Sequence, residues 1–286
     1  MIAPGDLLCV RVLNYLELAD RLRRSGISTA VDNQRKALAD SDHRLLTTPW
    51  AGGSPASAGI KSALGDAAFE SYDLAHCNLV GPGTIAVAEH AKRNEIPLVL
   101  HAHVTREDFR NSFRGSNVVA PVLGRYLRWF YRQCDVICTP TEPIRDALTA
   151  IGIDGRLKIW GRGVDTERFH PRWRSASWRR GLGIGPDELV IAYVGRLVRE
   201  KGLGVYADVM ETLRTQGRPV RGLIVGEGPL RPYLERRLPD TIFTGHLEGR
   251  ALSRAYASSD IFLFPSDSEA FGNVIVEAMA SGLPIV

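Results

Sequence analysis

Residues 265–282 read PSDSEAFGNVIVEAMASG and indicate a strand, a turn and a helix in succession. Glu269 and Glu277 lie on either side of a Phe-Gly-Asn turn at 271–273, which follows an apolar strand at 261–264. The helix is indicated by apolar and small residues that recur at helical spacing after the turn. A helix N-terminus offers free backbone N–H groups and the positive end of a dipole, so this turn suits a phosphate or sugar hydroxyls. The alternative is a solvated glutamate pair on an ordinary α/β unit.

Strands and helices alternate along the rest of the chain in two series, which predicts an α/β fold with parallel sheets. In the first series we expect strands at 27–31, 73–77, 97–101, 135–139 and 157–160, and helices at 12–24, 83–93, 117–132 and 142–150. In the second series we expect strands at 189–194, 221–225, 241–244 and 261–264, and helices at 203–216, 230–237 and 251–258. The sequence therefore predicts two Rossmann-like domains, 1–165 and 166–286.

The two ends of the chain and the segment between the domains carry further predictions. Residues 161–186 are rich in Gly, Pro, Arg and Trp and are expected to connect the domains. The helix at 12–24 has no strand before it, whereas a doubly wound sheet normally opens with one. At the other end, residues 283–286 resemble a strand that nothing covers. We therefore expect the first strand of the N-terminal domain and the C-terminal part of the second domain to be missing, so that the chain is a fragment.

Composition limits the class of protein. With 286 residues, of which 44% are hydrophobic, the chain can bury a substantial core. The net charge of +4 comes mostly from arginine and is weak evidence for a nucleic-acid partner, so we predict none. No apolar run approaches the about 18 residues that span a bilayer, and no signal-peptide core opens the chain, which predicts a cytoplasmic protein. Four cysteines without metal-finger spacing are predicted to be reduced, buried thiols.

Two stretches combine basic and aromatic residues. Residues 106–132 contain six basic and two acidic side chains, and residues 156–180 contain eight and two. Such mixtures favour an anionic membrane surface, which predicts a peripheral location on the cytoplasmic face of the membrane. The alternative is a pair of solvated faces whose aromatic residues pack in the core.

Cations and glycines follow the strands of the second series. Arg196 comes directly after the strand at 189–194, and Lys201 follows five residues later. An arginine fork and a lysine point charge held by one loop can neutralise a diphosphate, although both could also be solvated. Gly226-Glu227-Gly228-Pro229 after the next strand lets the backbone approach a ligand closely. This segment is no GxGxxG fingerprint because Arg231 occupies the third glycine position, which disfavours nicotinamide chemistry.

Three motifs in order resemble those of glycosyltransferase family 4, retaining enzymes of the GT-B fold that use sugar nucleotides. They are VGRLxxxKG at 194–202, GEGP at 226–229 and PSxSE followed by EAMASG at 265–282. Within the family, residues 159–171 are most similar to GDP-mannose-dependent α-mannosyltransferases and to sulfoquinovosyl- and glucosyl-diacylglycerol synthases, which act on lipids. The resemblance runs from about residue 12 to residue 286.

The resemblance implies a role for each matching residue of the second domain. Arg196 and Lys201 would bind the donor diphosphate and stabilise the leaving nucleotide. Glu269 would act as a catalytic residue at the donor sugar, and Glu277 would bind the ribose. The residues expected to assist through their backbones or near the base are Phe271, Gly272 and Asn273 at the sugar, and Gly226, Gly228, His246 and Leu247 in the loops.

In the first domain, the segment LHAHVTRED at 100–108 resembles the family loop that carries an active-site histidine. His103 is the better match by its distance from the strand start, and His101 is the second candidate. The implied task is to position donor sugar and acceptor. No Asp-x-Asp motif precedes the donor site, which predicts that neither a metal ion nor another cofactor is needed. The family mechanism, a front-face displacement with retention, is implied by the resemblance alone.

The prediction is therefore a retaining glycosyltransferase that moves a hexosyl group from a GDP- or UDP-linked sugar to a lipid or glycan hydroxyl. One alternative is a non-catalytic, truncated remnant of such an enzyme. Another is a sugar-nucleotide epimerase of the GT-B fold, which the pair of glutamates together with Arg196 and Lys201 disfavours.

Overall fold

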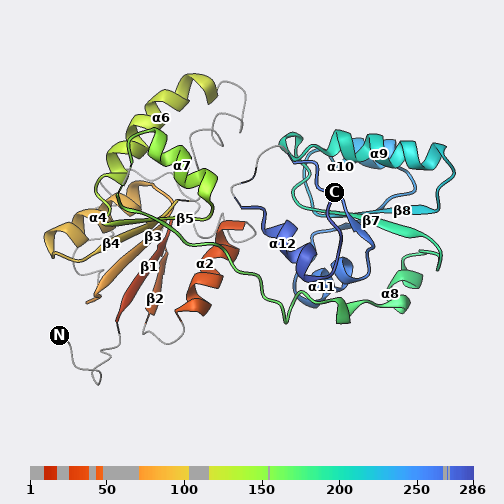
Figure 1. Ribbon diagram of the computed structural model, residues 1–286, viewed down its shortest axis with the longest axis horizontal. Helices are drawn as coiled ribbons and strands as arrows, with labels where there is room; N and C mark the ends of the chain where they lie inside the picture. The colour runs from red at the N-terminus through yellow and green to blue at the C-terminus, as the bar shows by residue number, and fades with distance from the viewer. Residues whose placement is uncertain are drawn as a thin grey trace. The chain divides into compact units, whose positions relative to one another are not determined.

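The structure, a computed structural model, describes residues 10–17, 26–38, 43–47, 71–102, 116–153, 155–266, 269 and 271–286. The chain divides into two compact units, Met1–Arg162 and Gly163–Val286, each built on its own sheet (Figure 1). All strand pairs described in both sheets are parallel. In each unit helices cover the sheet, as expected for parallel strands that are buried on both faces.

The sheet of the first unit has the strand order β2-β1-β3-β4-β5-β6. Its strands are β1 (Val12–Leu16), β2 (His43–Thr47), β3 (Leu74–Asn78), β4 (Leu98–His101), β5 (Val136–Thr139) and β6 (Leu157–Ile159). The helices are α2 (Gly26–Ala37), α4 (Pro82–Arg93), α6 (Ser116–Tyr131) and α7 (Glu142–Ala150).

The two faces of this first sheet differ in polarity. On one face, Leu13, Tyr15 and Leu100 belong to an apolar core to which α4, α6 and α7 also contribute. Because strand side chains alternate between faces, the opposite face carries Asn14 and His76, which are both buried.

The buried cysteines Cys77, Cys134 and Cys138 are free thiols, which confirms that prediction for the cysteines within the described residues.

The beginning of the chain differs from the prediction. Residues 12–16 form strand β1 in place of the start of a helix at 12–24, and residues 26–37 form helix α2 in place of a strand at 27–31. Every residue of β1 is buried, and a short apolar strand buried on both faces shows no alternation that would distinguish it from a helix. In α2, buried or half-buried residues recur at Ile27, Ala30, Val31 and Gln34, which is helical spacing.

The second unit has the strand order β10-β7-β8-β9. Its strands are β7 (Leu189–Val194), β8 (Val220–Val225), β9 (Ile242–Gly245) and β10 (Ile261–Phe262). The helices are α8 (Ala176–Gly181), α9 (Leu203–Thr215), α10 (Arg231–Arg237), α11 (Gly249–Ala257) and α12 (Asn273–Ala280), with short 3-10 helices η2 (Pro171–Trp173) and η3 (Arg199–Lys201). From residue 73 onward, the predicted strands and helices of both series are confirmed to within two residues at each end.

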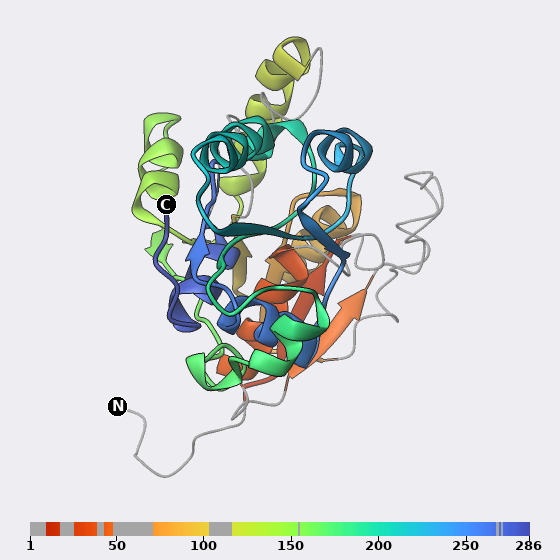
Figure 2. The ribbon, with the colours of Figure 1, turned by 90° about the vertical axis from the view of Figure 1, so that its right-hand side faces the viewer.

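Helices lie on both faces of the second sheet (Figure 1, and turned by 90° in Figure 2). Leu203 and Tyr206 of α9 and Leu234 of α10 pack on one face. Tyr256 of α11 and Ala278 of α12 pack on the other. At the edge beyond β10, the backbone N–H of Phe262 donates to Pro284 O at 2.9 Å, so the predicted terminal strand lies against β10.

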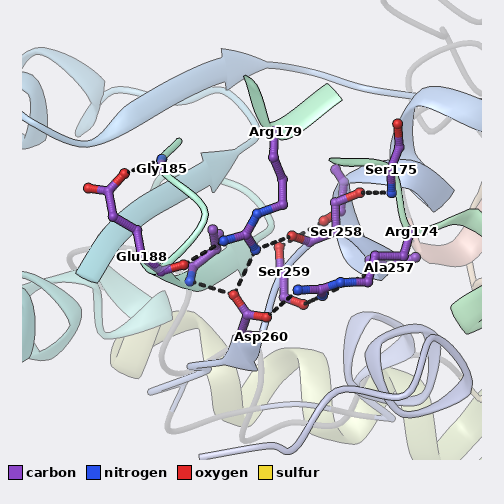
Figure 3. A network of polar contacts seen from close by, with 11 residues as sticks. Arg174, Ser175, Arg179, Gly185, Glu188, Ala257, Ser258, Ser259 and Asp260 are labelled. Atoms are coloured by element: carbon purple, nitrogen blue, oxygen red, sulfur yellow. Dashed lines mark hydrogen bonds and ion pairs between the residues drawn. The ribbon is translucent and has the colours of Figure 1, made fainter. Parts of the chain in front are cut away.

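The segment 161–186, predicted as a connection between domains, belongs from Gly163 onward to the second unit and contains η2 and α8. Arg179 of α8 is buried and donates to Asp260 Oδ2 at 2.8 Å, while Arg174 donates to Asp260 Oδ1 at 2.7 Å (Figure 3). Asp260 Oδ2 also accepts the backbone N–H of Val190 in β7 at 2.8 Å. Because this carboxylate joins α8 to the sheet, residues 163–186 pack as part of the second unit, and the division between the two units falls at the start of the predicted connection.

Candidate active site

The loops after β7, β8 and β9 meet at one edge of the second sheet. The N–H of Gly195 donates to Val225 O at 3.0 Å, and the N–H of Gly226 donates to Gly245 O at 2.8 Å. A Cβ at Gly226, whose φ is +140°, would lie 1.9 Å from Gly195 O. A Cβ at Gly228 would lie 2.5 Å from the carbonyl oxygen of Leu197. Both glycines are therefore required by contact between neighbouring loops, whatever ligand approaches them.

Lys201 and Glu269 are brought together across two loops. The ammonium group of Lys201 forms an ion pair with Oε1 of Glu269, and their side chains are 15% and 27% exposed. Ser266 Oγ also donates to Glu269 Oε1 at 3.2 Å. The loops touch because Gly202 has a left-handed φ of +64°, and a Cβ there would lie 1.9 Å from Pro265 O. The cation predicted for the diphosphate and the carboxylate predicted for the sugar are thus in direct contact.

Arg196 differs from Lys201 in its surroundings. Its side chain is 71% exposed, and its guanidinium lies 3.4 Å from Glu200 Oε1. A pair at this distance with so exposed an arginine contributes little to stability. The Arg196 guanidinium can therefore be redirected toward an anion at low cost. The loop itself is held in place, since Tyr193 OH donates to Arg196 O at 3.1 Å.

Glu277 projects from α12, which begins after the turn that contains Phe271 and Gly272. Gly272 adopts a left-handed conformation, with φ of +74°, at the N-cap of this helix. The Oε2 atom of Glu277 accepts a hydrogen bond from Tyr256 OH at 3.0 Å. Burial raises the pKa of Glu277 to about 7, although the Tyr256 hydrogen bond and the charge of Arg168 act in the opposite direction. Glu277 is therefore a carboxyl group that titrates near neutral pH.

The residues predicted near the base follow β9. His246 Nε2 lies 2.7 Å from Glu248 Oε1, and the two side chains are 37% and 66% exposed. Leu247 is partly buried and packs against the core on the α11 and α12 side of the sheet. Among the described residues, no group of three or more His, Cys, Asp or Glu side chains is arranged to hold a metal ion. Metal-independent transfer stays a prediction.

In the first unit, His101 is a core residue with 1% exposure. Its Nδ1 lies 2.8 Å from Gln34 Nε2 of α2, and its ring stacks on His76 at 6.2 Å between centroids. Burial and the neighbouring His76 lower the pKa of His101 to about 3, which keeps the ring neutral. This burial argues against His101 as a catalytic residue. The first candidate, His103, lies outside the described residues and stays a prediction.

Two side-chain contacts were not predicted from the sequence. Tyr256 was predicted only as part of a helix, yet its hydroxyl reaches Glu277. Trp160 stacks on His76 at 5.5 Å and so joins the histidine cluster. A tyrosine at a core position of a helix two elements before a motif glutamate gives no signal of such a contact, because the contact depends on how α11 packs on α12.

Comparison with known proteins identifies the class. The sequence model described as Glycosyltransferase Family 4 matches residues 15–168, and that described as Glycosyl transferases group 1 matches residues 188–286. The first match covers more than half of the chain, so the chain belongs to glycosyltransferase family 4. This confirms the resemblance stated above from its motifs.

Solved structures give the fold. The Anabaena protein Alr3699/HepE, in complex with UDP and glucose, superposes with a TM-score of 0.66 at 18% identity over 96% of this chain and 80% of that one. Sucrose-phosphate synthase from Thermosynechococcus elongatus gives a TM-score of 0.74 at 16% identity over the same shares of the two chains. The chain has the two-domain α/β architecture of GT-B enzymes.

Curated relatives are glycosyltransferases by name, and one of them is named for diacylglycerol. Sulfoquinovosyl transferase SQD2 of Arabidopsis thaliana is 35% identical over 219 residues, which are 75% of this chain and 42% of the relative. A GDP-mannose-dependent alpha-mannosyltransferase of Corynebacterium glutamicum is 36% identical over 56% of this chain and 38% of its own length. The processive diacylglycerol alpha-glucosyltransferase of Acholeplasma laidlawii is 24% identical over 97% of this chain and 78% of its own. The chain spans about two fifths of the length of the first two relatives.

Proposed function

We propose that this protein is a retaining hexosyltransferase, which moves a hexosyl group from a GDP- or UDP-linked sugar to the hydroxyl of a lipid or glycan. The observation that carries this proposal is the contact between Lys201 and Glu269 beside the Gly272 turn. It puts a cation, a carboxylate and a helix N-terminus at one edge of the second sheet. A cation and a helix N-terminus suit the diphosphate of a nucleotide-sugar, and a carboxylate suits its sugar hydroxyls.

In this proposal each group has its own task during transfer. Lys201 and the exposed Arg196 neutralise the diphosphate as the sugar–phosphate bond breaks, because negative charge develops on the departing phosphate oxygen. Glu269 accepts hydrogen bonds from the hydroxyls of the donor sugar, and Glu277 accepts those of the ribose. When the diphosphate binds Lys201, it takes the place of Glu269 as the anionic partner. The carboxylate of Glu269 then becomes available to the sugar.

We propose in addition that the acceptor is presented at an anionic membrane surface. A shallow hollow on α6 and the turn after it is lined by Arg125, Arg128, Trp129, Arg132 and Gln133. Trp129 is 51% exposed, which is high for so large an apolar side chain. Exposed arginines around an exposed tryptophan suit the interface between lipid headgroups and acyl chains. Within the described residues, no helix has the length and apolarity to cross a bilayer.

The donor part of the proposal is tested by titration calorimetry with UDP and GDP. We expect one of the two nucleotides to bind the wild-type chain, and Lys201→Ala to weaken that binding by about tenfold or more, since a charge-assisted contact is lost. Arg214→Ala is the matched control, because Arg214 belongs to an exposed ion pair with Asp240, with side chains 61% and 74% exposed. Absence of binding by the wild type to either nucleotide would favour the non-catalytic remnant.

The membrane part is tested by sedimentation with vesicles of zwitterionic lipid, with and without anionic lipid. We expect binding only to the anionic vesicles, weakened by salt and by Trp129→Ala. Tyr233→Ala is the control, because Tyr233 is also an exposed aromatic residue, at 43%. Its neighbour Arg237 is already paired with Asp208 and Glu211. Equal loss of vesicle binding in Trp129→Ala and Tyr233→Ala would contradict the proposal that the surface on α6 binds the membrane specifically.

A further inference from the structure

Tyr256 connects the interior of the second unit to Glu277. Its hydroxyl donates to Glu277 Oε2 at 3.0 Å and so joins α11 to α12. The tyrosine side chain is fully buried, with 0% exposure. A buried tyrosine hydroxyl requires a partner, and a carboxylate is a stronger acceptor than a backbone carbonyl.

Two aromatic neighbours fix the direction of this hydroxyl. Phe169 meets the Tyr256 ring edge-on, with 5.7 Å between centroids and 82° between planes. Phe262 of β10 lies at 5.8 Å on a tilted plane. Aromatic packing of this kind leaves the ring no alternative rotamer without opening a cavity. The hydroxyl therefore acts as a fixed donor toward α12.

The position of Glu277 in α12 indicates why the hydrogen bond from the Tyr256 hydroxyl matters. Helical side chains lean toward the helix N-terminus. Glu277 lies one turn after Asn273, the first residue of α12, so this lean brings its carboxylate closer to the N-terminus of the helix than its own Cα. We propose that Tyr256 is a positioning residue that holds the Glu277 carboxylate for the ribose of the nucleotide-sugar. This inference rests on the function proposed above, because it needs Glu277 to bind the donor.

The charges around Glu277 make the proposal sensitive to pH. Within the described residues, the groups that act on Glu277 are Tyr256 from α11 and Arg168 from the segment before η2. Burial raises the pKa of Glu277 to about 7, while Tyr256 and Arg168 lower it. An ionised carboxylate accepts hydrogen bonds from ribose hydroxyls more strongly than a protonated one. Nucleotide affinity should therefore be full above about pH 7 and should fall as the pH decreases through that value.

The first experiment measures UDP and GDP binding to the wild type and to Tyr256→Phe, from about one pH unit below to about one above the pKa of Glu277. We expect Tyr256→Phe to bind about tenfold more weakly near neutral pH, because a hydrogen bond to a charged group is lost. The pH midpoint of nucleotide binding should be higher in Tyr256→Phe than in the wild type, because the hydrogen-bond donor that stabilises the ionised form of Glu277 is gone. Nucleotides with a ribose that lacks its hydroxyls should show a much smaller difference between the two proteins.

Tyr206→Phe is the matched control for this series. Tyr206 is also fully buried in the second unit, and its hydroxyl donates to Ile191 O at 2.8 Å. Its loss removes a buried hydrogen bond of the same kind without touching a carboxylate. We expect the pH midpoint of nucleotide binding to be unchanged in Tyr206→Phe. Equal midpoints in Tyr256→Phe and the wild type would overturn the proposal while leaving the donor function intact.

A second measurement does not depend on nucleotide. Carbon NMR of the side-chain carboxyls follows the titration of Glu277 directly, and its resonance is assigned by its loss in Glu277→Gln. We expect the midpoint of Glu277 to rise in Tyr256→Phe and to stay in place in Tyr206→Phe. If the wild type bound neither UDP nor GDP, the proposed function would fail on that ground. An unchanged Glu277 midpoint in Tyr256→Phe would instead overturn the contact on which the positioning role rests.

Discussion

Lys201 and Glu269 form an ion pair although 68 positions separate them in the chain. Both side chains are partly shielded from water, at 15% and 27% exposure, so their interaction is screened less than that of a surface pair. In the proposed function the two groups contact different parts of one ligand, the diphosphate and the sugar. Before the nucleotide-sugar binds, Lys201 and Glu269 neutralise each other's charge.

We predict that Lys201→Ala and Glu269→Ala each reduce hexosyl transfer by about 100-fold or more, the usual cost of removing one group that stabilises developing charge. The free energy of unfolding should fall by about 1–3 kcal/mol, because each variant leaves a largely shielded charged group without its partner. Transfer is measured with a radiolabelled donor, and unfolding with urea. Arg214→Ala, which breaks the exposed pair with Asp240, should leave turnover unchanged. Full turnover in either site variant would remove that residue from the mechanism.

Gly226→Ala should destabilise the second unit by about 3 kcal/mol or more. The added Cβ would lie 1.9 Å from the carbonyl oxygen of Gly195, and the φ of +140° is unfavourable for any other residue. Gly204→Ala is the opposite control, because Gly204 lies in α9 and a Cβ there would meet nothing within 4 Å. That change should stabilise the protein by about 0.5–1 kcal/mol. Both are measured by urea denaturation, and a neutral effect of Gly226→Ala would mean that the loops separate readily.

Much of the fold could be predicted because local patterns and tertiary structure agree. In β7 an uninterrupted apolar run of six residues, Leu189–Val194, is bounded by a charged segment and a glycine, and its bounds match the prediction. In β1 the run Val12–Leu16 is interrupted by Asn14 and is followed directly by Glu17 and more apolar residues, so the pattern also fits a helix. Only the pairing of β1 between β2 and β3 decides between the two.

The candidate site divides in a similar way. Lys201 and Glu269 could be predicted, since each follows a strand at the edge where parallel strands end. Tyr256 could not, because its place in a helix indicates only a core residue. The stack of His76, His101 and Trp160 could not either, since Trp160 follows β6, which is separated in the sheet from the strands of the two histidines, β3 and β4, by β5.

The stability of the first unit should decrease between pH 6.5 and 4. Burial lowers the pKa of His76 from 6.5 to about 4, and burial with the nearby His76 lowers that of His101 to about 3. The unfolded chain therefore binds protons that the folded chain excludes, so the stabilisation is present above pH 6.5 and is lost as the pH falls. Each histidine should lower the free energy of unfolding by about 2 kcal/mol when the pH falls from about 7 to about 5.

Urea denaturation at the two pH values checks this, with His76→Gln as the test variant. That variant should lose about half of the pH dependence, because one of the two imidazoles with a lowered pKa is gone. In His246→Gln the stability of the first unit should keep its full pH dependence, because His246 lies in the second unit and is 37% exposed. Equal pH dependence in His76→Gln and the wild type would show that the buried histidines do not exclude protons.

Asp260→Asn should destabilise the second unit by about 3–5 kcal/mol, because it leaves the buried Arg179 without its anionic partner. The Arg179 side chain is 9% exposed and that of Asp260 is 18% exposed. Burial acts to raise the pKa of Asp260, but the hydrogen bonds from Val190 N–H and from the two arginines together outweigh it and lower the pKa below 3.8. This stabilisation is therefore present above pH 3.8 and is lost as the pH falls below it. Asp240→Asn, at an exposed pair, should change the free energy of unfolding by about 0.5 kcal/mol or less. If Asp260→Asn unfolded at the urea concentration of the wild type, the attachment of α8 to the sheet would depend on the backbone carbonyls that Arg174 and Arg179 also contact, and not on the charge of Asp260.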